Sequence, residues 1–264
     1  MNAAAPASPD SGLKLVLPGR IAPIGSGWDW IAGGWKLFVR APLMWIISVI
    51  LVIICAIAVG LVPILGHIAG QLLQPVVLGG FIVASHSLER GGDFELDHLL
   101  AGFKKNFGNL VVVGAIFVAC EILILLVFLA FVMFTLGTAF LAGGTEEIWS
   151  TFMASALTFA LGVLITLGLM LPLVAAYWFA PALVIMHDMP PVDAMKASFF
   201  ASFRNFLPFL LYGILLIPLG ILAAIPLGLG YLVLIPMTIA GVYVAYREIF
   251  TEEAASAPAK PTFA

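Results

Sequence analysis

One acidic side chain lies inside a long apolar stretch of this sequence. Glu121 is the only formally charged residue within residues 109–134, a segment long and apolar enough to cross a bilayer. A carboxylate in the middle of the lipid costs several kcal/mol unless it is protonated, paired or hydrated. We therefore expect Glu121 to be protonated and to meet a polar side chain of a neighbouring helix.

Two glutamines are the predicted partners of Glu121. Gln71 and Gln74 make residues 66–86 the least apolar of the expected membrane spans. At 1.5 Å per residue, Glu121 lies about 18 Å from one boundary and Gln74 about 12 Å from the other, which is nearly the same depth in a core about 30 Å thick. The contact is either part of a proton or ion relay or a single interhelical hydrogen bond worth about 0.6–2 kcal/mol. A relay usually has several ionisable groups along its path, which favours the single hydrogen bond.

The histidines are the remaining candidates for chemistry. His86, His98 and His187 fall near one predicted membrane surface, close in sequence to several acidic residues. A metal site needs three or four converging ligands with a supporting shell, and the sequence contains no HxxxH, HExxH or CxxC spacing. It also has no Gly-rich phosphate loop and no Ser-His-Asp order. We expect no metal, no cofactor and no catalytic residue, and rank an interfacial lipid-modifying enzyme last.

The composition places these residues in a membrane protein. Apolar residues make up 63% of the chain and charged residues 9%, whereas soluble proteins carry about 25% charged residues. The net charge of −3 gives no reason to expect a nucleic-acid partner. The stretches without formal charge predict an all-α polytopic fold with six spans, at residues 42–62, 66–86, 109–134, 152–177, 206–225 and 229–247.

Two local features of these spans follow from the sequence. Residues 143–147 are expected to form the turn between the third and fourth spans. We expect Pro172 to kink the fourth span or Pro181 to begin a second short segment, because proline removes a helix hydrogen bond.

The basic residues predict the orientation. In a six-span arrangement all 11 lysines and arginines fall on one side of the membrane, before the first span, between spans two and three, between four and five, and after the sixth. The positive-inside rule then places both termini in the cytoplasm. Five or seven spans would divide the basic residues between the two sides.

A short amphipathic segment precedes each outgoing span. In GWDWIAGGWKLFVR, DFELDHLLAGFKKNF and PPVDAMKASFFASFRNF, apolar side chains recur at helical spacing, as in helices that lie at the headgroup level. The expected apolar stripes are Trp28, Ile31, Trp35 and Phe38; Leu96, Leu99, Leu100, Phe103 and Phe107; and Val192, Met195, Phe199 and Phe203. Asp188 is a possible N-cap of the third segment, with Pro191 in its first turn.

These segments divide the chain into three similar units. Each unit would consist of an interfacial helix and a hairpin of two spans, at residues 25–86, 92–177 and 190–247 within a membrane domain of residues 25–250. Convergence on common membrane-helix patterns would give the same appearance. Residues 1–24 and 251–264 are expected to be disordered tails, because they lack a long apolar run.

Three stretches resemble a known family. GWDWIAGGWKLFVRAPLMW, LERGGDFELDHLLAGF and WFAPALVIMHDMPPVDAMKASFFASFRNFLPFLLYG are similar to an uncharacterised family of proteobacterial six-span inner-membrane proteins. They are more distantly similar to the membrane domain of some glycerophosphodiester phosphodiesterases. The resemblance covers roughly residues 25–250. It implies topology and a bacterial inner-membrane location, and it brings no catalytic residues.

Most of the informative polarity lies on the predicted cytoplasmic side. This distribution favours a non-enzymatic module that binds membrane lipids, or a protein partner, through a basic and aromatic rim. The residues expected in this rim are Trp28, Trp35, Lys36, Arg40, Lys104, Lys105, Lys196, Arg204 and Arg247. The alternative is a small transporter or channel with a midplane polar site formed by Glu121, Gln71 and Gln74.

Overall fold

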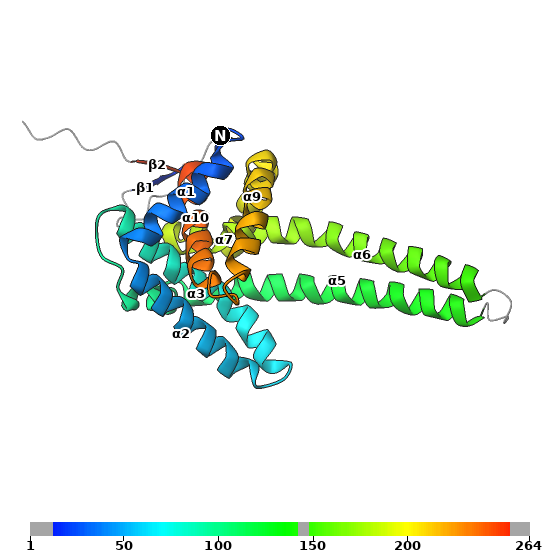
Figure 1. The fold of residues 1–264 in the computed structure, drawn as a ribbon. Coiled ribbons are helices and arrows are strands. Elements are labelled where there is room, and N and C mark those ends of the chain that lie inside the picture. The colour runs from blue at the N-terminus through cyan, green and yellow to red at the C-terminus, as the bar shows by residue number, and fades with distance from the viewer. Residues whose placement is uncertain (1–12, 142–147, 254–264) are drawn as a thin grey trace, which may run out of the picture.

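Six membrane-capable helices dominate the structure. The computed structural model describes residues 13–141 and 148–253, so the turn expected at residues 143–147 lies outside the described residues. The six helical crossings are α2 (Pro42–Gly60), α3 (Leu65–Glu89), α5 (Phe107–Leu141), α6 (Ile148–Trp178) continued by α7 (Ala180–His187), α9 (Phe206–Ala224) and α10 (Tyr231–Phe250). The all-α polytopic fold is therefore confirmed. Figure 1 shows α5 and α6 side by side as a long hairpin that projects from the rest of the molecule.

Three shorter segments precede the outgoing helices. They are α1 (Ser26–Arg40), a 3₁₀ helix η1 (Leu96–Leu100) that continues into α4 (Ala101–Lys104), and α8 (Pro191–Arg204). The second segment is not the continuous amphipathic helix that the spacing predicts. Its backbone becomes extended at Lys105 and takes a positive φ of 59° at Asn106, so the segment ends after one α-helical turn.

Small residues form part of the buried face of each segment, and the predicted apolar stripes are only partly buried. On α8, Met195 of the predicted stripe is buried together with Ala194 and Ser198, whereas Val192 and Phe203 of the stripe are exposed. On α1 the predicted stripe is divided, because Ile31 and Phe38 are buried while Trp28 and Trp35 are exposed. The η1–α4 stripe is exposed apart from Leu99. Large apolar side chains on these segments therefore remain available to lipid.

Glycine allows two of these segments to approach neighbouring helices closely. A Cβ at Gly34 of α1 would collide with the carbonyl oxygen of Met237 and the backbone of Gly241 on α10. A Cβ at Gly102 of α4 would collide with the carbonyl oxygen of Val76 on α3. Both contacts bring two helix backbones together, as small residues do in membrane proteins.

The fourth crossing is divided at Phe179. Pro181 lies in the first turn of α7, as the second of the two proline hypotheses predicts, while Pro172 lies inside α6. Ser198 of α8 bridges the break: its Oγ accepts the N–H of Phe179 at 2.9 Å and donates to the carbonyl oxygen of Ala175 at 2.7 Å. An unbroken α-helix would join these two backbone groups directly.

The ends of the membrane domain are held by a short sheet. Strand β1 (Leu13–Leu15) pairs antiparallel with β2 (Thr251–Glu253), and Leu13 is buried. The prediction of disordered tails is therefore wrong for these residues, since alternation in Leu-Lys-Leu provides one buried strand face. Residues 1–12 and 254–264 of the predicted tails lie outside the described residues.

Prediction of the helix cap before α8 was also wrong. Asp188 adopts a left-handed conformation, with φ 53°, and follows the last turn of α7, while Pro190 occupies the N-cap position of α8. Pro191 lies in the first turn, as expected.

Candidate functional site

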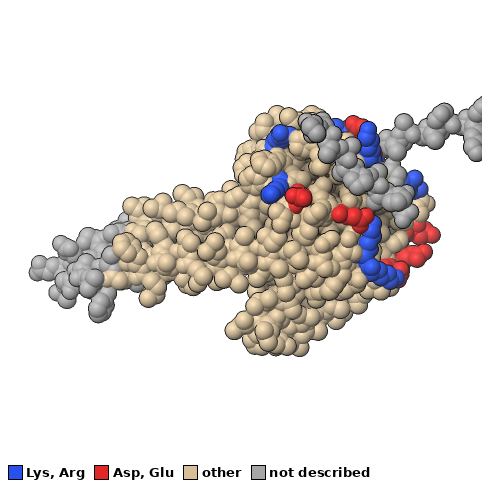
Figure 2. Space-filling view, turned by 180° about the vertical axis from the view of Figure 1, so that it is seen from behind, with Lys and Arg blue, Asp and Glu red and all other residues tan. Residues whose placement is uncertain are grey.

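Charged residues gather at one end of the molecule. Among the described residues, every lysine and arginine and every acid except Glu121 lies in residues 14–40, 89–105, 188–204 or 247–253. These stretches connect or follow the helix ends, and Figure 2 shows charged side chains on the body of the molecule, away from the α5–α6 tip. We call this region the charged end.

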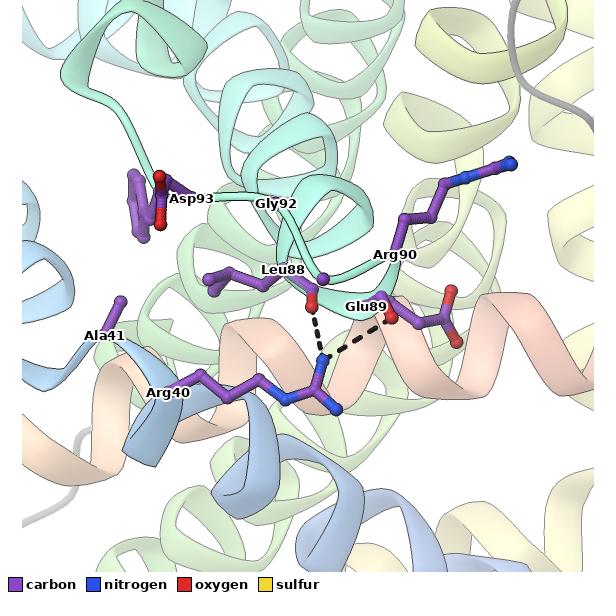
Figure 3. A pocket seen from close by; sticks show the side chains of 9 residues that line it. Arg40, Ala41, Leu88, Glu89, Arg90, Gly92 and Asp93 are labelled. Carbon is purple, nitrogen blue, oxygen red and sulfur yellow. Dashed lines mark hydrogen bonds between the residues drawn. The ribbon is translucent and has the colours of Figure 1, made fainter.

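A shallow groove lies at the charged end where α1 meets α3. It has a volume of about 470 Å³ and is lined in part by Arg40, Glu89, Arg90 and Asp93. The Arg40 guanidinium donates to the carbonyl oxygens of Leu88 and Glu89 (Figure 3). These carbonyls belong to the last turn of α3, where helix carbonyls lack intrahelical partners and the dipole is negative. Arg40, a predicted rim residue, thus joins α1 to α3. We call such a contact, between a polar residue before an outgoing helix and the backbone that leads into the next interfacial segment, a joint.

A hydrogen-bonded network connects the same end of α3 with α10. Tyr243 donates to Glu89 Oε2 at 2.5 Å, and Arg247 Nε donates to the same oxygen at 2.7 Å. Because the single hydroxyl proton of Tyr243 is directed to Glu89, His86 Nδ1, at 2.9 Å, must donate to the tyrosine oxygen. Arg247 also donates to Thr251 Oγ1 at 2.9 Å. This predicted rim cation is therefore tied to the helix bundle.

The other two histidines near this end occupy separate environments. His98 Nδ1 accepts the backbone N–H of Glu95 at 3.1 Å and completes a capping box for η1. His187 is buried, and its Nε2 lies 2.6 Å from the hydroxyl of Tyr246. Within the described residues, no group of three or more His, Cys, Asp and Glu side chains is arranged to hold a metal ion.

A second joint connects the start of α5 with the end of α7. Asn106 Nδ2 donates to the carbonyl oxygen of Val184 at 3.1 Å and to Asp188 Oδ1 at 2.5 Å. Lys105 Nζ lies 3.3 Å from the same carboxylate oxygen. The predicted rim cation Lys105 is consequently paired with the segment that leads into α8.

A third joint connects the end of α8 with the stretch that precedes α1. Asn205 is fully buried; its Oδ1 accepts the N–H of Ala22 at 2.7 Å, and its Nδ2 donates to the carbonyl oxygen of Arg20 at 3.0 Å. These partners are 183 and 185 residues away in sequence. Asn205 therefore adds to the β1–β2 pairing in holding the beginning of the described chain against the third hairpin.

Glu248 secures α1 to α10 near this third joint. Its two carboxylate oxygens accept hydrogen bonds from Ser26 Oγ at 2.7 Å and from Trp30 Nε1 at 2.6 Å. Trp30 is almost completely buried, although the predicted apolar stripe contains the exposed Trp28 and not Trp30. A second shallow groove, of about 710 Å³, lies beside this contact and is lined by Arg20, Asp29, Val244, Arg247, Glu248, Thr251 and Glu252.

The remaining predicted rim residues face outward. Trp28 and Trp35 are 58% and 48% exposed. Lys36, Lys196 and Arg204 are exposed, and no ion pair joins them to a carboxylate in the part of the chain that the structure describes.

Lys104 differs from the other outward-facing cations. Its Nζ lies 2.5 Å from Asp97 Oδ1, and both side chains are more than half exposed. Exposed pairs of this kind contribute about 0–1 kcal/mol. The ammonium group of Lys104 is nevertheless already in contact with a carboxylate, unlike those of Lys36 and Lys196 among the described residues.

The structure brings Glu121 together with one of its two predicted partners. Gln71 Nε2 donates to Glu121 Oε2 at 3.2 Å, whereas Gln74 is exposed. α5 begins at Phe107, two residues before the predicted span, so Glu121 lies about 21 Å along the helix from that end. At this depth it is level with Gln71 rather than with Gln74. The polar contact therefore consists of Glu121 and Gln71, without Gln74.

Comparison with known proteins identifies a similar bacterial protein. A protein of Burkholderia thailandensis, described as a probable inner membrane protein, is 29% identical over 265 residues, which cover 89% of this chain and 95% of the relative. This chain is similar to an inner-membrane protein. No protein-family profile and no solved structure matches it.

The similarity and the six membrane-capable helices together support an inner-membrane location. The cytoplasmic placement of the termini and the resemblance to the phosphodiesterase membrane domain stay predictions.

Proposed function

We propose that this protein is a non-enzymatic inner-membrane module that binds anionic lipid headgroups at its charged end. The observation that supports this function is the sequence adjacency, on α1 and α8, of exposed aromatic side chains and cations that have no ion pair among the described residues. Trp35 adjoins Lys36, and Phe203 adjoins Arg204. Aromatic rings favour the boundary between headgroups and hydrocarbon, while lysine and arginine favour the phosphates.

Aromatic rings are grouped toward the ends of two of the interfacial segments. The ring centroids of Phe103 and Phe107 lie 5.9 Å apart, and those of Phe199 and Phe203 lie 4.7 Å apart. These segments precede membrane-capable helices, so their exposed rings lie at the level where a bilayer surface is expected. The bound lipids would surround the charged end rather than enter the packed core.

The test compares two sets of charge-neutral variants. Lys36→Gln, Lys196→Gln and Arg204→Gln together remove three unpaired cations, whereas the matched control Lys104→Gln and Lys105→Gln removes cations that already have carboxylate partners. At about 1 kcal/mol per cation, the triple variant should bind anionic lipid about 100-fold more weakly. Native mass spectrometry of protein from nanodiscs containing phosphatidylglycerol measures the retained lipid. Equal retention by the triple variant and wild type would refute the proposal, and a protein that co-purifies in place of lipid would favour a partner-binding module.

A second candidate function is a small transporter or channel. It is favoured by the contact between Glu121 and Gln71, since ionisable groups inside membrane helices often mark ion pathways. Proton and sodium flux into vesicles that contain the protein would measure this activity. The transporter proposal requires a flux that Glu121→Gln abolishes, and an absence of flux in the wild type would eliminate it.

A further inference from the structure

The predicted units contact one another in the same way at each joint. The interfacial segment of each unit packs on the returning helix of the preceding unit: η1–α4 on α3, α8 on α6, and α1 on α10. One small residue is central to each contact, namely Gly102, Ser198 and Gly34. The third of these contacts joins the last unit to the first, so the three units close into a ring.

A polar residue at the start of each outgoing helix closes the corresponding joint. Arg40 binds carbonyl oxygens at the end of α3, Asn106 binds the end of α7, and Asn205 binds the stretch before α1. In each case the bonded backbone leads into the interfacial segment of the next unit. Two joints are also crossed by the chain itself, whereas the joint between units three and one has only noncovalent contacts.

Arg40, Lys105 and Arg204 occupy corresponding positions before the outgoing helices of the three units. Arg204 differs from the other two in its contacts. Arg40 is bonded to carbonyl oxygens, and Lys105 is paired with Asp188. At the third joint the neutral Asn205 makes the contacts with the neighbouring unit, and Arg204 has no ion pair among the residues that the structure describes. The third unit therefore has an exposed cation that ring closure does not require.

We propose that Arg204 binds the phosphate of an anionic phospholipid, with Lys196 as a second cation on the same face of α8. This proposal rests on the proposed lipid-binding function and assigns it one principal position. Phe200 and Phe203 lie between the two cations in sequence and are 55% and 52% exposed. Their rings provide an apolar surface for the acyl chains next to the phosphate, which is the arrangement of a lipid at a membrane boundary.

The contribution of Lys196 follows from its place on the helix. Lys196 precedes Phe200 by four residues and Arg204 by eight, so the three side chains lie along one helical face. Asp193 lies in the first turn of the same helix, three residues before Lys196 and about three turns from Arg204. Arg204, in the last turn, is therefore the cation of this face that lies farthest from the acid.

The test measures phosphatidylglycerol retained by the full-length protein after extraction from nanodiscs, with phosphatidylcholine discs as the comparison. Arg204→Gln should reduce retained phosphatidylglycerol about fivefold and leave thermal unfolding unchanged, because the side chain makes no joint contact. Arg204→Lys should restore most of the retention. The control Lys105→Gln removes a cation that already has a carboxylate partner, so lipid retention per folded molecule should stay at the wild-type value.

The outcomes distinguish this site from the broader function. Unchanged retention in Arg204→Gln, with loss in the three-cation variant, would overturn this site but leave the proposed function in place. Unchanged retention in both would overturn both. Displacement of the lipid by millimolar inorganic phosphate would assign the position to free phosphate and overturn the lipid assignment.

Discussion

Replacing Ser198 with alanine tests the account of the divided fourth crossing. The serine Oγ is the hydrogen-bond partner of both Phe179 N–H and Ala175 C=O, and Ser198 is completely buried. The carbonyl would keep a bond from Ser202 Oγ at 3.2 Å, but residues 13–141 and 148–253 offer no such substitute for the N–H. A buried donor left without a partner costs about 1–3 kcal/mol. We therefore expect Ser198→Ala to destabilise the protein by about 2 kcal/mol.

Thermal unfolding in a mild detergent, followed by tryptophan fluorescence, measures this cost. With about 2–4 °C for each kcal/mol in a chain of this size, Ser198→Ala should lower Tm by about 4–8 °C. Ser202→Ala is the matched control, since it removes the weaker of the two bonds to Ala175 and should lower Tm by less. If Ser202→Ala were the more damaging change, the serine bridge would not be what stabilises the break.

Three further predictions concern other contacts. Glu121→Gln should change Tm by less than about 1 °C, because the new amide oxygen still accepts a bond from its glutamine partner on α3; a large loss would show that the carboxylate itself is required. Gly34→Leu should reduce the yield of folded protein in size-exclusion chromatography, because its side chain collides with α10, while Gly25→Leu, which has open space around it, should not; equal yields would contradict this packing. Tyr243→Phe removes the donor to Glu89 and should cost about 1–3 kcal/mol in detergent unfolding; wild-type stability would show that the network contributes little.

The number and type of the crossings could be predicted because the bilayer imposes them. A helix must satisfy its own backbone groups in lipid and needs about 20 apolar residues to cross, so the uncharged stretches locate the spans directly. The division at Pro181 was also predictable from proline chemistry. The serine that bridges this division was not, because it comes from a separate helix and its spacing carries no signal.

The buried faces of the interfacial segments could not be predicted for a related reason. Apolar periodicity in α1 does not distinguish a side chain that faces lipid from one that faces protein. Trp28 and Trp30 differ by two positions, yet Trp30 is buried against α9, where its ring contacts those of Phe209 and Tyr212, and Trp28 is exposed. The close approach made possible by Gly34 decides which face is covered, and this depends on a backbone more than 200 residues away.

The Glu121 contact was predictable in depth but not in its choice of partner. Both glutamines lie within one helical turn of each other on α3, and a shift of two residues in the start of α5 is enough to favour Gln71.

The unequal lengths of the helices affect how the surrounding bilayer must adapt. α5 has 35 residues and is about 50 Å long, whereas α2 has 19 residues and is about 28 Å long. A bilayer is about 40–45 Å thick including its headgroups, so α5 fits within it only when inclined by roughly 30–40°. The α5–α6 hairpin and the α2–α3 hairpin then diverge, as the ribbon in Figure 1 shows. The two hairpins therefore cross the surrounding bilayer at different inclinations.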